Sequence, residues 1–504
     1  MRRITASVLG VLFLLSVCCF SAFAQAQSTA ADYTYPPQEV LLIDLVIQPY
    51  RYLSMTHSTQ RRKHPAVVSI NGGPAQRIAV RVRGAMSLDD GMNFASKRIP
   101  MELLFDDSDP DGKFQGNASL KLINCYTPAK LLTQLIAMQT FRYLGIPTPR
   151  MQPAFVRIND VDFGLYLALE DLNEDFVRQH FGSATLYRRF NMREQISGEE
   201  AAADSGVTLE NVKMKVKADH GVQTLQMYER SRARGESILP YLDADELLRF
   251  LACEMFVFDQ DGIQYLKNCY FAEHDGKLSA LPWDQSVVFN VFQTDRRDDE
   301  TFLYYEQQYR VGTVMYDQLL RNEESVARYR QYIRQLNDGF LNPDTFLPWL
   351  EQYIRFLSPY FQRDNSIGLR SAHMAQDLMS GTNLYDDMSG NLLLTFRVYH
   401  DQTDAILSGK ADWYSIPDGM SAGAEDPETE ADEMRVYGTD HSIVYRICSN
   451  YWKKCRQAYY QENASAIGKT GAALAAVFLL TVLSVKMPKG KKPRGSPREK
   501  EGEP

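Results

Sequence analysis

Cysteine is scarce in this chain of 504 residues, which contains only seven. Two of the seven, Cys18 and Cys19, lie in an apolar N-terminal run, so an odd number remains beyond it and no two of those have metal-ligand spacing. Cys448 and Cys455 lie in an apparently helical segment, which separates their Cα atoms by about 10 Å, too far for a disulfide. The sequence therefore excludes a disulfide scaffold and predicts buried, unpaired thiols.

Several catalytic motifs are missing as well. The eight histidines form no H-E-x-x-H pair, and neither a G-x-S-x-G elbow nor a G-x-x-x-x-G-K-[ST] loop occurs. These absences argue against a zincin protease, an α/β-hydrolase and a P-loop NTPase. The formal net charge is −8, and residues 25–485 hold −14 because the first 24 residues carry +2 and the last 19 carry +4. Such an acidic body is a poor nucleic-acid binder, so we expect no nucleic-acid partner.

The two ends of the sequence have patterns typical of export and of membrane anchoring. Residues 1–24 combine two arginines, an apolar run and an Ala-Phe-Ala site, which is typical of a cleaved secretory signal peptide. Residues 470–486 are free of charge between Lys469 and Lys486, and their apolar core reaches about 22 Å, which snorkelling lysines can extend. We therefore expect a transmembrane anchor there, a basic cytoplasmic tail at 487–504, and an extracytoplasmic protein held in the membrane.

The spacing of apolar residues changes along the middle of the chain, from the alternation of strands to the repeat of helices. Residues 40–105 alternate as strands do, residues 131–141 show a helical apolar face, and residues 155–169 read as a hairpin around Asn159-Asp160. From residue 243 helices dominate. Residues 371–466 form an accessory region, and its acidic stretch at 417–433 is expected to be a solvated insertion.

One stretch concentrates polar side chains among apolar ones. A helix beginning at a capping box, Asp243 with Glu246, should end near Asp259-Gln260-Asp261-Gly262. A hairpin then follows, with Asn268 before its first strand and Asp284 just after its second. A protein kinase orders its catalytic Asp, its metal-binding Asn and its metal-binding Asp in this way.

Two interpretations of that stretch remain open. The hairpin should bring Asn268 and Asp284 together, where their oxygens suit Mg²⁺, while Asp261 accepts the proton of an attacking hydroxyl. Alternatively, Asp and Asn occur at helix ends and turns for local hydrogen bonding alone. Asp259 is expected to be such a solvated, capping residue.

Three segments resemble the spore-coat CotH kinases. They are "AVRVRGAMS", "GIPTPRMQPAFVRINDVDFGLYLALED" and the stretch from Asp261 through "KNCYFAEHDGKLSALPWD". The resemblance implies an α+β, divergent bilobal protein-kinase-like fold over residues 38–370. Its strand-rich N-lobe would span about 38–170 and its helical C-lobe about 171–370.

The resemblance also implies roles for individual residues. Asp261 would be the catalytic residue, and Asn268 and Asp284 would bind Mg²⁺ or Mn²⁺ with ATP. The remaining nucleotide-binding candidates are Arg83, Gly84, Lys97 and Glu170. The sequence departs from the family at Ala85-Met86, where Asn-Ser is common, and the helix at 131–141 offers no clear acidic partner for Lys97.

Two functions follow from the resemblance. The first is an atypical kinase that transfers the ATP γ-phosphoryl group to Ser or Thr of a protein substrate. The alternative is a catalytically weak surface or coat protein that keeps the fold for structure or adhesion. Metal-dependent nucleotide binding separates the two.

Overall fold

The computed structural model describes residues 33–189, 214–289, 318–366, 392–408 and 442–462, apart from short gaps at 85, 94–95, 126–127, 219, 258, 260–261, 264–267 and 287. Two compact units are present, residues 1–448 and 449–504. In the second unit, only the end of one helix is described. The N-terminal residues 1–24, expected to be a signal peptide, lie outside the described residues.

Seven strands form a closed barrel in the order β1-β2-β3-β4-β5-β7-β6. The pairing of β1 with β6 is parallel and closes the ring, whereas the other pairs are antiparallel. Side chains of β1 alternate between buried and more exposed, as a barrel wall requires. The bounds are β1 Leu41–Ile47, β2 His64–Ile70, β3 Gln76–Val82, β4 Met101–Leu104, β5 Ser119–Ile123, β6 Met151–Ile158 and β7 Val161–Glu170.

A separate sheet of four strands lies in the part of the chain that was expected to be helical. Its order is β11-β10-β8-β9. The strands are β8 Thr185–Arg189, β9 Met214–Ala218, β10 Cys269–His274 and β11 Lys277–Leu281. The α+β content is as predicted, but the simple division into a strand-rich and a helical lobe was wrong. The strands of the first part close into a barrel, and the second part has a sheet of its own.

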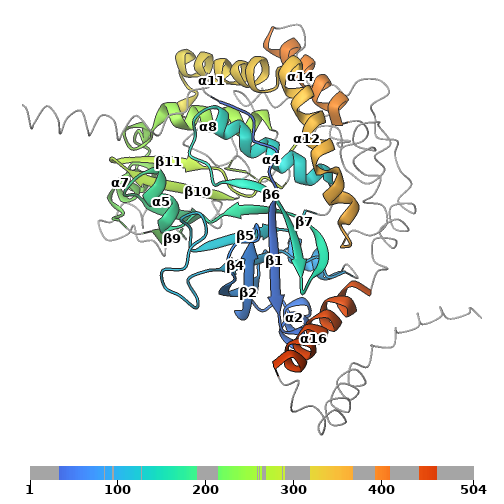
Figure 1. Ribbon diagram of the computed structural model, residues 1–504. Coiled ribbons are helices and arrows are strands. Elements are labelled where there is room, and N and C mark those ends of the chain that lie inside the picture. The colour runs from blue at the N-terminus through green and yellow to red at the C-terminus, as the bar shows by residue number, and fades with distance from the viewer. Residues whose placement is uncertain are drawn as a thin grey trace, which may run out of the picture. The chain divides into compact units, whose positions relative to one another are not determined.

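Helices α4, α8, α11, α12 and α14 lie at one end of the barrel, beside the small sheet, whereas α2 lies at the other end (Figure 1). The helix predicted after Asp243 is α8, and the Asp243 carboxylate caps it by accepting a hydrogen bond from the Glu246 N–H at 3.0 Å. The reciprocal bond of a capping box is not made, because the Asp243 N–H donates to the Leu278 carbonyl at 3.3 Å. The helical segments are α2 Pro49–Thr56, α3 Met86–Asn93, α4 Pro128–Tyr143, α5 Glu174–His180, α7 Gln223–Ala233, η2 Leu239–Tyr241, α8 Ala244–Phe256, α11 Glu323–Gln335, η6 Leu336–Phe340, α12 Pro343–Arg363, α14 Leu392–Leu407 and α16 Ser442–Glu462.

The expectation of a C-terminal transmembrane helix, and of a protein held in the membrane by it, is corrected here. No helix among the described residues is both long enough and apolar enough to cross a membrane. Residues 470–486 and the tail at 487–504 lie outside the described residues. The prediction of buried, unpaired thiols is confirmed for Cys125 and Cys253. Cys448 and Cys455 are also unpaired, but Cys448 is half-buried and Cys455 is exposed.

A buried ion pair joins the barrel to the end of α12. Arg98 follows the loop after α3, and its Nη1 lies 3.1 Å from Asp364 Oδ2. Asp364 also accepts hydrogen bonds from the Leu165 N–H at 2.8 Å and from the Ser366 hydroxyl at 2.7 Å. A Cβ at Gly164 would lie 2.5 Å from side-chain atoms of this network. Glycine is therefore required on β7 by the close approach of charged groups rather than by a turn.

Glu246 gives the fold a predictable pH dependence. Burial and the neighbouring Asp243 raise the pKa of its carboxyl from 4.5 to about 7. Between those two pH values the folded protein holds a proton that the unfolded chain releases, so stability falls as the pH rises from about 4.5 to about 7. We expect Glu246→Gln to raise the free energy of unfolding at pH 8 by about 3 kcal/mol more than at pH 4.

Urea denaturation at pH 4, 6 and 8 measures this effect. Glu323→Gln is the matched control, because Glu323 also lies in the first turn of a helix but is exposed. Its stability should follow the wild-type pH profile within about 0.5 kcal/mol. If the free energy of unfolding of Glu246→Gln depends on pH with the same slope as that of wild type, the buried carboxyl does not determine the stability change in this pH range.

Candidate functional site

The hairpin of β10 and β11 positions two of the predicted site residues. Tyr270 pairs with Leu281, and Asp275-Gly276 makes the turn with positive φ at both residues. That register carries Asn268 and Asp284 to the same open end of the hairpin. Both are half-buried and have positive φ, 45° and 54°. Non-glycine residues rarely adopt this backbone, so the local chain direction at both positions is specialised.

Arg83, just after β3, reaches this end of the hairpin from the barrel. Its guanidinium carbon lies 6.0 Å from the ring centroid of Trp283, the residue before Asp284. Burial lowers the pKa of Arg83, while the carboxylates of Asp284 and Glu102 act in the opposite direction. Two segments about 200 residues apart in sequence therefore place a cation and a carboxylate in one electrostatic environment.

Lys121 on β5 is a site residue that the sequence analysis missed. Its Nζ lies 4.3 Å from the ring centroid of Trp283 and forms an ion pair with Asp171. The Ser119 hydroxyl donates to the same carboxylate at 3.1 Å. A buried lysine is expensive unless a carboxylate compensates its charge. The signal was a lysine between Leu120 and Leu122 in a strand that is apolar on both sides of it.

Two further charged residues complete the surroundings. Glu102 on β4 accepts from Arg81 at 2.6 Å. Burial alone would raise the pKa of Glu102, but the Arg81 hydrogen bond and the nearby cations outweigh it, and the pKa is lowered. Arg188 on β8 lies 5.7 Å from the ring centroid of Tyr270, which itself packs 5.1 Å from Trp283. We call Arg83, Lys121 and Arg188 the cationic cluster.

The remaining nucleotide-binding candidates lie in different surroundings. Glu170 is buried at the end of β7, and its carboxylate is held by Arg150 at 2.8 Å. Lys97 is half-buried and donates to the Met92 carbonyl at 2.6 Å, and burial lowers its pKa. Gly84 has φ +83°, and a Cβ there would lie 2.5 Å from the Ser87 hydroxyl. Among these residues, contacts therefore join Arg83, rather than Lys97 or Glu170, to the hairpin end.

Asp261 lies outside the described residues, but the chain on both sides of it is fixed. Asp259 is buried and accepts from the Gln285 side chain at 3.0 Å, so the expectation of a solvated residue was wrong. The Ile263 N–H donates to Glu254 at 2.9 Å. A Cβ at Gly262 would meet that same carboxylate at 2.4 Å. This loop is thus tied to the residue next to Asp284, and Gly262 is required by close packing.

The side chains at the hairpin end must suit both a nucleotide and a divalent metal if the predicted roles are correct. No group of three or more His, Cys, Asp or Glu side chains in the described part of the chain could hold a metal ion by itself. A carboxylate and an amide at one hairpin end leave metal positions for phosphate oxygens, and the cationic cluster complements a polyphosphate. The residues present fit an ATP–Mg²⁺ complex in which the nucleotide supplies part of the metal's coordination.

Comparison with known proteins gives two matches. The sequence matches the family described as CotH kinase protein over residues 80–380. It is also 23% identical over 193 residues to the inner spore coat protein H of Bacillus subtilis (strain 168). That alignment covers 35% of this chain and 51% of the relative, so the chain spans about half the length of the relative it matches.

Proposed function

The chain belongs to the CotH kinase protein family, and from this premise we propose that it transfers the γ-phosphoryl group of ATP to a serine or threonine hydroxyl of a protein. The observation that supports this most directly is the cationic cluster beside Asp284. Phosphoryl transfer requires positioned positive charge around the nucleotide phosphates more than it requires covalent chemistry from the protein. Cations from the barrel and from the small sheet would supply that charge.

In this proposal the cationic cluster contacts the phosphates. Lys121 and Arg83 reach the site from the barrel, and Arg188 reaches it from the small sheet. The carboxylates of Asp171 and Glu102 keep these cations in place before the nucleotide arrives, so little reorganisation accompanies binding. Gly84 would allow the backbone after β3 to approach a phosphate, whereas Lys97 and Glu170, whose contacts lie elsewhere, are given no role in this proposal.

The hairpin end and the loop after α8 supply the other groups. Asn268 and Asp284 would hold Mg²⁺ or Mn²⁺, and the metal–ATP complex would supply the phosphoryl group and neutralise its charge. Asp261 would orient the attacking hydroxyl and accept its proton. The hydrogen bond from Gln285 to Asp259 links the residue after Asp284 to the residue two positions before Asp261.

A coat protein with little or no catalysis is the second candidate. The observation that favours it is the relative named as an inner spore coat protein. In that case the fold would serve as an assembly surface, and the charged residues would stabilise the junction between barrel and sheet. Nucleotide binding distinguishes the two functions, because a purely structural protein has no need of it.

The expected result for nucleotide binding is a metal-dependent rise in melting temperature. ATP at 100 times its Kd stabilises the folded protein by about 2.7 kcal/mol. Asp284→Ala should abolish the rise with Mg²⁺ and ATP, because it removes the ionic metal ligand. Its melting temperature without ligand should change little, since the side chain is half-buried at a strand end.

Asp275→Ala is the control for this series. It removes a carboxylate from the turn at the opposite end of the same hairpin, where the side chain is 87% exposed. Thermal-shift titrations of wild type and both variants should show equal ATP responses for wild type and Asp275→Ala. Equal responses for wild type and Asp284→Ala would refute metal binding at Asp284, and no response in wild type would favour the coat-protein function.

A further inference from the structure

A groove lies along α11, and none of its lining residues belongs to the cationic cluster. Its volume is about 610 Å³, and it is lined by the exposed side of α11 and by Leu407 at the end of α14. The opposite side of α11 carries Tyr329 and Ile333, which are buried in the core. The helix is therefore anchored on one side and presents the other to the groove.

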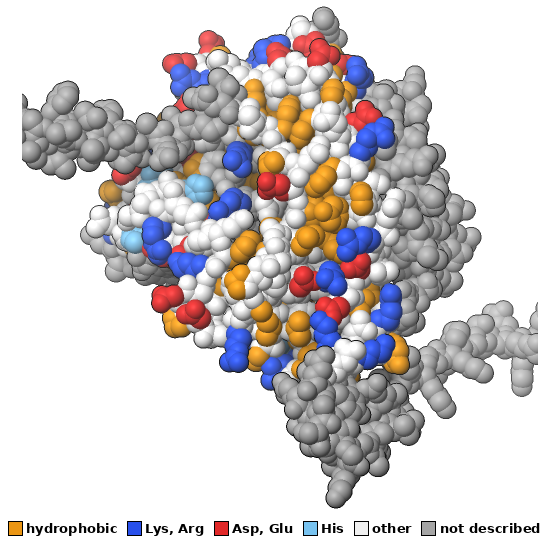
Figure 2. Space-filling view, in the orientation of Figure 1, with side chains coloured by type: hydrophobic (Ala, Val, Ile, Leu, Met, Phe, Trp, Pro, Cys, Tyr) orange, Lys and Arg blue, Asp and Glu red, His pale blue; other side chains and the backbone are white. Residues whose placement is uncertain are grey.

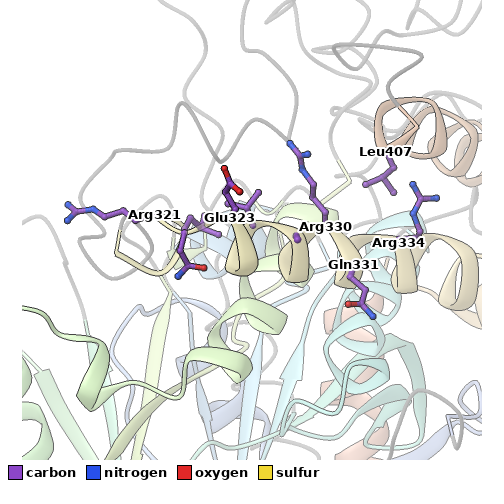
Figure 3. Close-up of a pocket in the computed structure, with 10 residues that line it drawn as sticks. Arg321, Glu323, Arg330, Gln331, Arg334 and Leu407 are labelled. Carbon is purple, nitrogen blue, oxygen red and sulfur yellow. The ribbon is translucent and has the colours of Figure 1, made fainter.

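The lining of the groove is cationic. Arg321, Arg330 and Arg334 are exposed and line it, against a single carboxylate, Glu323. Figure 3 shows Arg330 and Glu323 projecting on the same side of α11, with Arg334 beside Leu407. On the face shown in Figure 2, by contrast, acidic and basic side chains are interspersed.

Two of these arginines, Arg321 and Arg334, can each bind a further carboxylate. Arg334 lies 3.8 Å from Asp338 and 3.7 Å from Asp404, and all three side chains are about half exposed. Such surface pairs contribute little and exchange readily for better-placed acceptors. Among the described residues, no ion pair involves Arg321. An arginine fork binds a carboxylate with two parallel hydrogen bonds, so an acidic chain segment suits this groove.

We propose that the groove binds the acidic segment 417–433 of the same chain. That segment reads PDGMSAGAEDPETEADE and contains seven carboxylates and no basic residue. The chain leaves α14 at Leu407, which itself lines the groove, and only residues 408–416 separate it from the acidic segment. Nine residues span up to about 30 Å, whereas α11 is about 20 Å long, so the segment reaches every arginine.

The tether raises the effective concentration of the acidic segment. A short linker places a tethered ligand at millimolar effective concentration near its site. Weak pairwise contacts are then sufficient for occupancy. Because the pairs are exposed, the interaction weakens as salt is added. In this proposal residues 417–433, which the sequence predicts to be a solvated insertion, bind the groove along α11 of the same chain.

A competition experiment tests the proposal. A fluorescent peptide with the sequence of residues 417–433 is titrated with two full-length proteins, wild type and a variant whose seven carboxylates in that segment are changed to amides. Fluorescence anisotropy at 50 mM salt should show binding to the neutralised variant and at least about tenfold weaker binding to wild type, where the tethered segment competes. In the neutralised variant, Arg330→Gln with Arg334→Gln should weaken peptide binding about tenfold or more.

A charge-matched control separates the groove from general attraction. Arg178→Gln with Arg355→Gln removes the same charge from side chains that are 61% and 63% exposed on other helices, and should leave the peptide affinity unchanged. Equal affinity for wild type and the neutralised variant overturns the tethered segment as occupant and assigns the groove to an acidic partner protein. No binding to the neutralised variant, or equal loss in the control pair, overturns the groove as an acidic-peptide site.

Discussion

Replacing Asp364 with alanine should destabilise the protein by about 3–5 kcal/mol, more than any other single change considered for this fold. The side chains of Arg98 and Asp364 are 1% and 0% exposed, and their closest atoms are 3.1 Å apart. Removing the carboxylate leaves an arginine buried without its counter-charge. It also leaves the Leu165 N–H without its acceptor at 2.8 Å. Both penalties act on the folded state alone.

Urea denaturation of purified Asp364→Ala and Asp364→Asn measures the effect. The asparagine variant keeps a hydrogen-bond acceptor, so its loss should be smaller, and it remains measurable if the alanine variant fails to fold. Arg363→Ala is the matched control, because the neighbouring Arg363–Asp162 pair is exposed and contributes about 0–1 kcal/mol. A loss below about 1 kcal/mol in Asp364→Ala would show that Arg98 finds other compensation.

The ion pair has a consequence for the candidate site. Asn124 follows β5, the strand that carries Lys121, and its side chain donates to the Arg98 carbonyl at 2.9 Å. The Arg98 carbonyl also packs so closely against α3 that a Cβ at Gly91 would lie 2.2 Å from it. Fixing Arg98 therefore fixes both the end of β5 and the helix that follows Arg83. The helical part of the chain thus helps to position the cationic cluster on the barrel.

Local patterns in the sequence predicted most of the individual elements. The helix N-cap at Asp243 and the turn at Asp275-Gly276 are confirmed, because caps and two-residue turns depend on a few neighbouring residues. The same locality explains why the hairpin could be expected to bring Asn268 and Asp284 to one end. Its register follows from the turn, and nothing distant has to be known.

Contacts between residues that are distant in the sequence could not be predicted from local patterns. Barrel closure depends on the parallel pairing of β1 with β6, two strands more than 100 residues apart. Lys121 looked like one polar residue in a strand, because its partner Asp171 lies 50 residues later in the sequence. The family resemblance instead implies Lys97, because that lysine precedes a strand as a lysine does in the CotH kinases. Three-dimensional pairing, rather than sequence order, singles out Lys121.

The last expectation concerns the chemical step and rests on the proposed kinase function. Asp261→Asn should lower the rate of phosphoryl transfer by about 10²–10⁴, because it removes the group that would accept the hydroxyl proton. ATP- and metal-dependent stabilisation should persist, since Asp261 need not contact the metal.

Autophosphorylation with γ-labelled ATP, measured beside the thermal shift, checks both halves of this expectation. Asp259→Asn is the informative comparison, because Asp259 is buried and bonded to Gln285 at 3.0 Å. Asp259→Asn should lower the melting temperature, and any fall in its rate of phosphoryl transfer should accompany that loss of stability. Asp261→Asn should lower the rate while the melting temperature stays unchanged. A wild-type rate in Asp261→Asn would assign the proton to another group. A wild type that binds ATP but transfers nothing would overturn phosphoryl transfer to protein while leaving the nucleotide site in place.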